Sequence, residues 1–319
     1  MKNKIKFIKN RFFLVLISCI LFISASAHTA CCDCYAAAVT DAAVSADTSS
    51  VSEAPACETG TVAVKDSVTR YIKFGSGSKI MVILPGLTIN FITDNCDVVA
   101  DAYSQFCDAY TIYLFCIKDD VPEGCTLEEL AEDTAAACTA LGISDAYVLG
   151  ISMGGFLGIY LASEYPELVS KLLLASSAAR SNSGNDKLLT RWSKLADVCS
   201  RYTLAYNMVS YMYSDATISE FGDMLTLGYE FISNKELKRF SHTAAAIIGF
   251  DFSDRISLIK CPLYVMGSYG DQVLGPEASL EIAELTGCPI YMYSEEYGHA
   301  FFDEAEDFSD RVYEFFKSE

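Results

Sequence analysis

The chain has 319 residues, and 51% of them are apolar, which is enough for one large core or two smaller ones. Its 23 basic residues are outnumbered by 42 acidic residues, so the formal net charge is −19 at pH 7. Such an acidic surface repels phosphate backbones and anionic lipid surfaces, and this argues against nucleic acid as a partner.

The first 27 residues have the three-part pattern of an export signal. MKNKIKFIKNR is basic, FFLVLISCILFI is apolar, and SASA supplies the small residues that predict cleavage after Ala27. The apolar part is too short for an ordinary membrane span. We therefore expect a signal peptide over residues 1–27 and a secreted or cell-surface protein. The alternatives are an uncleaved N-terminal membrane anchor and a lipoprotein modified at Cys19.

Residues 28–60 are rich in Ala, Ser, Thr, Val and Asp and keep no helical or strand period. This composition predicts a flexible low-complexity tether, which could end at a membrane or in the medium. The folded domain is then expected over residues 61–319.

The 13 cysteines do not indicate a small disulfide scaffold, because the chain has ample apolar residues for a core. Cys116 and Cys138 lie in apolar segments, where a thiol packs as a small hydrophobe. CCDC, at residues 31–34, lacks the paired spacing of a zinc site. With no zinc-protease motif and no phosphate-binding loop, the sequence predicts neither a metal nor a cofactor.

Seven segments rich in β-branched and aromatic residues predict strands. Several are continuous apolar runs, as in the buried strands of a mostly parallel sheet. The segments are VTRYIKF (68–74), KIMVILP (79–85), YTIYLFC (110–116), AYVLG (146–150), KLLLAS (171–176), PLYVMG (262–267) and PIYMYS (289–294).

Helical patterns with recognisable ends alternate with these strands. Thr126 and Glu129 have capping-box spacing, and Gly142 suits the end of the same helix. Pro276 and Gly287 bracket another helix in the same way. The alternation predicts an α/β fold with a doubly wound, mostly parallel sheet.

Residues 181–250 break this alternation. They have helical patterns without a convincing strand, and their seven acidic residues balance their seven basic ones. We expect a helical insertion between the strands KLLLAS and PLYVMG. Its aromatic and methionine side chains could contact a ligand or could pack the insertion onto the core. These side chains are Tyr202, Tyr206, Met208, Tyr211 and Met212.

The segment YVLGISMGGFLGIYLA, residues 147–162, places Ser152 between a predicted strand and a predicted helix. Gly150 and Gly154 lie two residues to either side, where larger side chains would collide around a strained turn. Such a nucleophile elbow lifts the serine hydroxyl to the carboxyl end of the sheet. It also starts a helix at Met153, whose N–H can face a developing oxyanion. The alternative is a glycine-rich turn with a capping serine.

On this motif and its setting, the chain from Val62 to Lys317 resembles the α/β-hydrolase fold family. The resemblance implies an α/β-hydrolase fold in which the insertion at about residues 181–250 forms a helical cap over the active site. It also implies a catalytic triad in the chain order serine, acid, histidine.

The base that activates a serine is expected among three histidines. His28 lies in the predicted tether, and His242 lies in the predicted cap, where a packing role is the simpler interpretation. His299 follows the last predicted strand, which is the position that the resemblance implies for the catalytic histidine. We therefore expect His299 to act as general base and then as general acid.

The resemblance places the acid of the triad after the penultimate strand. Asp271, in the loop that leaves PLYVMG, matches that position. Its expected role is to hold the tautomer of His299 and to stabilise the imidazolium. Asp251 and Asp254 precede the strand and are alternatives, and Glu277 is a further substitute.

The resemblance places the second oxyanion donor in the loop after KIMVILP. The backbone N–H of Leu87, in Pro85–Gly86–Leu87, is the candidate, alongside that of Met153. The family often has His-Gly at this point, whereas this chain has Pro-Gly. Gly86 could also be an ordinary turn glycine.

Together these patterns predict a secreted serine hydrolase that cleaves a carboxylic ester or related acyl bond of a small uncharged molecule. The alternatives on the same triad are a C–C bond hydrolase and an acyltransferase. A third alternative is a non-catalytic ligand-binding member of the fold, because fold alone does not determine function.

Overall fold

The computed structural model describes residues 55–65, 67–226, 229 and 231–318. The predicted signal peptide and the predicted tether up to residue 54 lie outside the described residues. No helix within the described ranges is long and apolar enough to cross a membrane.

Eight strands form one sheet in the order β1-β2-β4-β3-β5-β6-β7-β8. Neighbouring pairs from β4 to β8 are parallel, whereas β2 runs antiparallel to both β1 and β4. The predicted α/β fold with a mostly parallel sheet is confirmed. The strands are β1 (Cys57–Val64), β2 (Ser67–Phe74), β3 (Lys79–Leu84), β4 (Tyr110–Phe115), β5 (Ala146–Ile151), β6 (Val169–Ala175), β7 (Leu263–Ser268) and β8 (Ile290–Tyr293).

Strand β1 is absent from the predicted set, and residues 57–60 of it were expected in the tether. Among the described residues it pairs with β2 alone, from Cys57 opposite Phe74 to Val64 opposite Ser67. Because it lies at the edge of the sheet, most of its side chains are exposed or half-buried. An edge strand of this kind lacks the continuous apolar run that marks the buried strands.

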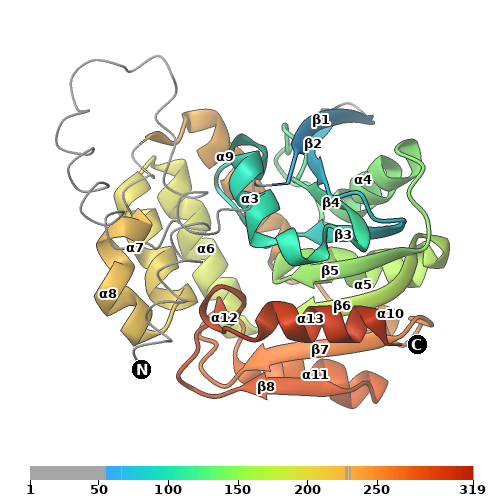
Figure 1. Cartoon of the computed structure of the whole chain (residues 1–319). Coiled ribbons are helices and arrows are strands. Elements are labelled where there is room, and N and C mark those ends of the chain that lie inside the picture. Colours follow the sequence, from blue (N-terminus) through green and yellow to red (C-terminus); the bar gives the residue numbers. More distant parts are fainter. Residues whose placement is uncertain (1–54, 66, 227–228, 230, 319) are drawn as a thin grey trace, which may run out of the picture.

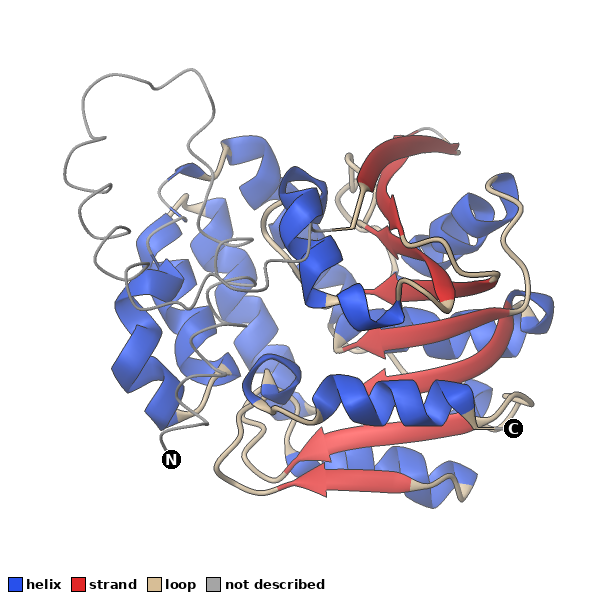
Figure 2. Ribbon diagram, viewed as in Figure 1, coloured by secondary structure: helices blue, strands red, loops and turns tan. Residues whose placement is uncertain are grey.

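Helices cover both faces of the sheet (Figures 1 and 2). Helices α3 and α13 pack on one face, and α4, α5 and α11 pack on the other. Successive residues of β3 serve opposite faces, since Met81 and Ile83 join the first layer and Val82 and Leu84 the second. The helices are α3 (Cys96–Ala102), α4 (Leu127–Ala140), α5 (Met153–Glu164), α6 (Ser183–Asp197), α7 (Arg201–Met212), α8 (Asp215–Thr226), α9 (Asn234–Ile247), α10 (Ser253–Ile256), α11 (Pro276–Thr286), α12 (Phe301–Glu304) and α13 (Phe308–Lys317), with 3₁₀ turns η1 (Ile92–Asn95), η2 (Ser104–Phe106) and η3 (Pro166–Leu168).

The predicted helix ends are confirmed. Thr126 Oγ1 accepts from Glu129 N–H at 3.2 Å, and Glu129 Oε2 accepts from Thr126 N–H at 2.9 Å, which completes the capping box of α4. Gly142 follows that helix with φ of +69°. Pro276 opens α11, and Gly287, with φ of +68°, closes it. These signals act within one turn, so the local sequence suffices to place them.

Helices α6 to α9 lie between β6 and β7, in the span where the sequence predicts a helical insertion; we refer to residues 181–250 as the cap. The two ends of the cap meet, because Ser181 N–H donates to the Phe250 carbonyl at 2.9 Å. Figure 2 shows the arrowheads of the parallel strands pointing toward these helices. The carboxyl edge of the sheet, where parallel α/β folds place their sites, therefore faces the cap.

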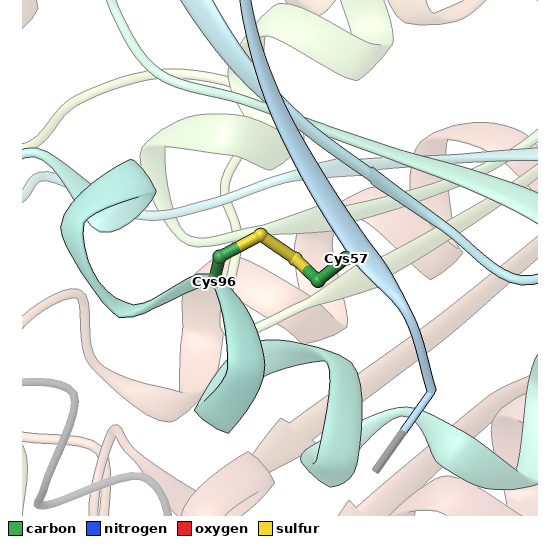
Figure 3. The surroundings of a disulfide bond; sticks show 2 residues. All are labelled: Cys57 and Cys96. Atoms are coloured by element: carbon green, nitrogen blue, oxygen red, sulfur yellow. A yellow bond between two sulfur atoms is a disulfide. The ribbon is translucent and has the colours of Figure 1, made fainter.

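Cys57 of β1 and Cys96 at the start of α3 form a disulfide (Figure 3). No pattern in the sequence singled out this pair, because its partners are 39 residues apart. Cys116 and Cys138 are free and buried, as predicted for cysteines that pack as small hydrophobes.

We expect the Cys57–Cys96 disulfide to be a large contributor to stability. Its sequence separation of 39 corresponds to a loop-closure contribution of roughly 4 kcal/mol in the chain-entropy treatment, as an upper bound. Cys57→Ser should therefore lower the urea midpoint, and dithiothreitol should lower that of the wild type but hardly that of the variant. Equal midpoints for wild type and variant without reductant would contradict this expectation.

Candidate active site

Ser152 lies at the turn between β5 and α5, with φ of +52° and ψ of −120°. A left-handed φ is strained for a residue with a side chain, at about 1–3 kcal/mol. Backbone contacts hold the strained residue. Ser152 N–H donates to the Ala175 carbonyl at 2.8 Å, and the Ser152 carbonyl accepts from Gly155 N–H at 2.8 Å and from Ser177 Oγ at 3.2 Å. The turn has the geometry of a nucleophile elbow.

The glycines around Ser152 are required by close packing. A Cβ on Gly154 would lie 1.9 Å from the Leu84 carbonyl oxygen, and one on Gly150 would lie 2.7 Å from Gly155 Cα. Neither position has room for a side chain. The start of α5 can therefore approach the end of β3 closely enough to present Ser152 at the edge of the sheet.

The structure brings Ser152, His299 and Asp271 into one hydrogen-bonded chain. His299 Nε2 lies 3.0 Å from Ser152 Oγ, and His299 Nδ1 lies 2.8 Å from Asp271 Oδ2. The His299 and Asp271 side chains are buried, whereas Ser152 is half-buried and so more accessible. Because a carboxylate only accepts hydrogen bonds, His299 Nδ1 carries a proton, and Nε2 is left to accept from the serine hydroxyl.

The second oxygen of Asp271 is held by its own loop. Asp271 Oδ1 accepts from Val273 N–H at 2.8 Å and from Leu274 N–H at 3.0 Å. The carbonyls of Val273 and Leu274 in turn accept from the side-chain amides of Asn185 (3.3 Å) and Asn182 (3.0 Å), at the start of the cap. The cap therefore supports the loop that carries the acid.

The loop of His299 is held from two sides. Ser176 Oγ, at the end of β6, donates to the His299 carbonyl, and Ala300 N–H donates to the Met212 carbonyl of the cap at 2.7 Å. The Glu304 side chain, which is 2% exposed, links this loop to the cap. Its carboxylate accepts from Gly298 N–H at 2.7 Å and from Ser214 N–H and Oγ at 2.9 and 2.7 Å. Sequence reasoning missed Ser176 and Glu304, because nothing in the pattern marks a buried carboxylate that accepts from backbone groups.

Glu304→Ala should loosen the loop that carries His299. It removes the acceptor of the buried Gly298 N–H and of the half-buried Ser214 N–H, which costs about 1–3 kcal/mol of stability. The turnover number for a p-nitrophenyl ester should fall together with the thermal midpoint. Glu306→Ala, an exposed change two residues away, serves as the control and should alter neither value. Wild-type turnover by Glu304→Ala would show that His299 does not depend on this bridge.

The alternative candidates do not join this chain of hydrogen bonds. His242 Nδ1 lies 2.7 Å from the Val121 carbonyl oxygen, which is the packing contact expected of it. Asp251 Oδ1 accepts from the Ser253 N–H at 2.9 Å and also from its hydroxyl, and these bonds lower the pKa of Asp251. Asp254 and Glu277 lie in the first turns of α10 and α11. Of these four carboxylates, Asp271 is the one that contacts His299.

Two backbone segments meet at Ser152 where the oxyanion donors are expected. Met153 is the first residue of α5, and it is buried. Gly86 packs against the serine, since a Cβ on it would lie 3.2 Å from Ser152 Cβ. Leu87 follows Gly86 and lines the adjoining cavity. Pro85–Gly86–Leu87 therefore passes directly beside the serine, as a donor loop must.

A cavity of about 220 Å³ adjoins the elbow between the sheet and the cap. Its walls are mostly apolar and include Gly86, Leu87 and Ile151 from the core. Asp303 is also part of its lining, and Asp303 Oδ2 accepts from the Tyr213 hydroxyl at 3.0 Å. The cavity can therefore bury an apolar group next to Gly86 and Ile151, which lie beside Ser152.

The cap side chains singled out from the sequence divide into three groups. Tyr211 is half-buried and packs against the core. Met208 and Met212 line the cavity, whereas Tyr202 and Tyr206 stack on each other at the surface and are 66% and 57% exposed. Tyr213 lines the cavity although its spacing in the sequence did not distinguish it. Helical periodicity alone does not reveal which face of α7 meets the core.

Comparisons with known proteins agree with the fold. Residues 80–205 match the family described as alpha/beta hydrolase fold. A candidate carbamate hydrolase, RutD, from Rhizobium rhizogenes is 24% identical over 206 residues, which is 62% of this chain and 77% of the relative.

Two solved structures have the same architecture. MGS-M2, an α/β hydrolase from a deep-sea metagenome library, superposes with a TM-score of 0.73 at 18% identity, over 82% of this chain and 98% of its own. The enol-lactonase from Burkholderia xenovorans LB400 superposes with a TM-score of 0.70 at 18% identity, over 81% of this chain and 100% of its own.

The fold and the site together define an enzyme of the α/β-hydrolase type. The eight-stranded sheet, the elbow at Ser152 and the match over residues 80–205 agree on this class. Residues 80–205 match the α/β-hydrolase fold family, and a solved α/β hydrolase shares the fold over 82% of the chain.

Proposed function

We propose that this protein is a secreted serine hydrolase that cleaves a carboxylic ester, or a related acyl bond, through an acyl-enzyme on Ser152. The observation that carries the proposal is the chain of hydrogen bonds from Ser152 through His299 to Asp271, with distances of 3.0 and 2.8 Å. A serine hydroxyl becomes a useful nucleophile only when a base is within reach of its proton. A protein that only binds a ligand needs no such chain.

The reaction would proceed in two halves. Ser152 Oγ attacks the acyl carbon while His299 Nε2 accepts its proton, and Asp271 stabilises the imidazolium. The N–H groups of Leu87 and Met153 stabilise the oxyanion. His299 then gives the proton to the leaving alcohol, whose departure leaves the acyl group on Ser152. Water, deprotonated by His299, attacks that acyl group, and the acid departs as Ser152 regains its proton.

The substrate class follows from the cavity. Its mostly apolar walls favour an uncharged, apolar group of small to medium size, because an anionic group would lose its hydration there. The two similar proteins described above, a candidate carbamate hydrolase and an enol-lactonase, have names that describe hydrolysis of an acyl bond in a small molecule. We therefore favour small uncharged esters, with lactones, thioesters and amides or carbamates as related substrates.

Labelling with a fluorophosphonate probe tests the proposed nucleophile without a known substrate. The probe phosphonylates a serine that a neighbouring base activates, and peptide mapping should locate the label on Ser152. Absence of labelling, or a label on another residue, would refute the proposal. A non-catalytic binding protein would give no label.

A series of p-nitrophenyl esters tests the proposed substrate class. We expect short and medium acyl chains to give higher kcat/KM values than emulsified long chains. An ester that bears a carboxylate should be slower than its neutral analogue of equal length, because the carboxylate would lose its hydration among the mostly apolar walls. A preference for the carboxylate-bearing ester would show that the electrostatics of the cavity have been misjudged.

We also propose that the protein is exported. The predicted signal peptide, residues 1–27, lies outside the described residues. The Cys57–Cys96 disulfide supports export, because disulfides persist mainly in oxidising compartments. Sequencing the N-terminus of the protein recovered from its native compartment should give His28 as the first residue. A lipid-modified Cys19 at the N-terminus, or an uncleaved leader, would contradict secretion and indicate membrane attachment.

A further inference from the structure

Residues 85–91 join β3 to η1; we refer to them as the oxyanion loop. The loop begins beside Ser152 at Gly86, carries Leu87 and contributes every one of its residues to the lining of the cavity. It forms neither helix nor strand. Its position therefore depends on contacts that its carbonyls and side chains make with other parts of the molecule.

Arg239 of α9, in the cap, makes two of these contacts. Its Nη2 donates to the Ile89 carbonyl at 2.7 Å, and its guanidinium carbon lies 3.9 Å from the centroid of the Phe91 ring. Ile89 and Phe91 stand two and four residues after Leu87. One cap side chain thus holds both the backbone and an aromatic ring of the oxyanion loop.

The Phe91 ring is also held from the core. The guanidinium carbon of Arg70, in β2, lies 4.2 Å from the same ring centroid. Arg70 is itself fixed by hydrogen bonds to Asp119, the shortest at 2.6 and 2.8 Å. Phe91 therefore contacts both a cation of the core and a cation of the cap.

Arg239 is buried at a cost in free energy. It is 4% exposed, its Nε has no hydrogen-bond partner among the described residues, and burial lowers the pKa of its guanidinium. Charged side chains are rarely buried this deeply without a paired carboxylate. Its contacts with Ile89 and Phe91 offset this cost together with the nearby charges of Glu236 and Asp119, so the oxyanion loop is among the groups that hold the buried cation.

We propose that Arg239 is a positioning residue for the oxyanion hole, holding the Leu87 N–H in place from the cap through Ile89 and Phe91. This inference rests on the proposed function of Ser152 and Leu87. It makes the cap part of the catalytic apparatus as well as a cover for the cavity. Because an oxyanion donor acts on charge that develops only in the transition state, its displacement should lower kcat and leave KM nearly unchanged.

The test compares Arg239→Met with His242→Leu, which lies one turn further along α9. His242 also joins the cap to the core, but its contact is the Val121 carbonyl and not the oxyanion loop. Arg239→Met should lower kcat for a p-nitrophenyl ester by about 10-fold or more, with KM changed less than about 3-fold. His242→Leu should keep kcat within about 2-fold even if its thermal midpoint falls.

A transition-state analogue separates positioning from folding. A trifluoromethyl ketone places an oxyanion in the hole once Ser152 adds to it, so its affinity should fall in Arg239→Met by about the same factor as kcat. Arg239→Lys keeps the charge but loses the planar stack, and it should show an intermediate loss in both values. This second variant also decides the question if Arg239→Met does not fold.

The outcomes distinguish the two proposals. If the wild type takes no fluorophosphonate label on Ser152 and does not bind the ketone, the proposed function fails. If the wild type does both, but Arg239→Met or Arg239→Lys keeps kcat and ketone affinity within about 2-fold, only the role of Arg239 is refuted. An equal loss of kcat in His242→Leu would likewise refute it, because the effect would then be a general loosening of the cap.

Discussion

Ser152→Ala is expected to reduce the turnover of an activated ester by a factor of about 10⁴ or more, since loss of the nucleophile removes the acyl-enzyme route. The thermal midpoint should be nearly unchanged. Alanine meets the same positive φ as serine, and the backbone bonds of residue 152 to Ala175 and Gly155 remain available. Steady-state rates, the fluorophosphonate label and the thermal midpoint measure these three expectations.

Ser163→Ala is the matched control for that variant. Ser163 lies on the same helix, α5, and its hydroxyl donates to the Tyr160 carbonyl at 3.0 Å, away from the elbow. It should keep full activity and full labelling. Wild-type turnover by Ser152→Ala would remove Ser152 from the mechanism, whatever its position in the elbow.

His299→Ala should cost about as much activity as Ser152→Ala, and the double variant should cost hardly more, because the members of a triad act as one unit. His299 Nε2 is the group placed to take the serine proton, at 3.0 Å. Rates of the two single variants and the double variant test this directly. Losses that multiply in the double variant would mean that the two residues act independently.

Asp271→Asn should reduce activity by up to about 10⁴-fold through the tautomer of His299. Two backbone N–H groups, from Val273 and Leu274, hold the position of Oδ1, so the amide oxygen of asparagine will occupy it. The amide NH₂ then faces His299 Nδ1, which must become the acceptor. The proton moves to Nε2, where it points at Ser152 and prevents proton abstraction.

Asp251→Asn is the control for this change. Asp251 is the alternative acid that the sequence left open, and its carboxylate accepts from Ser253 instead of from a histidine. The variant should keep wild-type kcat/KM. A neutral Asp271→Asn together with an inactive Asp251→Asn would show that the acid has been misassigned.

The cap is tied to each loop of the site. Asn182 and Asn185 bind the loop of Asp271, Met212 and Ser214 bind the loop of His299 directly and through Glu304, and Arg239 binds the oxyanion loop. None of these contacts involves neighbours in sequence. The cap therefore bears on the geometry of the site as well as on access to it.

Features that depend on neighbouring residues were determined by the sequence itself. The capping box of Thr126 and Glu129 and the closing Gly287 act within a single helical turn. The buried strands are continuous apolar runs, and the elbow needs small residues at fixed spacing from Ser152, since a Cβ on Gly154 would overlap the Leu84 carbonyl. Local sterics and periodicity depend only on the order of residues along the chain, so these features could be predicted.

Only the tertiary structure decided the long-range pairings. The Cys57–Cys96 disulfide, the edge strand β1 and the bridges through Glu304 and Arg239 join segments that no periodicity relates. Tyr206 and Met208 stand two residues apart on α7, yet one is exposed and the other lines the cavity. The physical reason is that burial and hydrogen-bond partners depend on which surfaces meet in space, and helical spacing is the same whichever face turns inward.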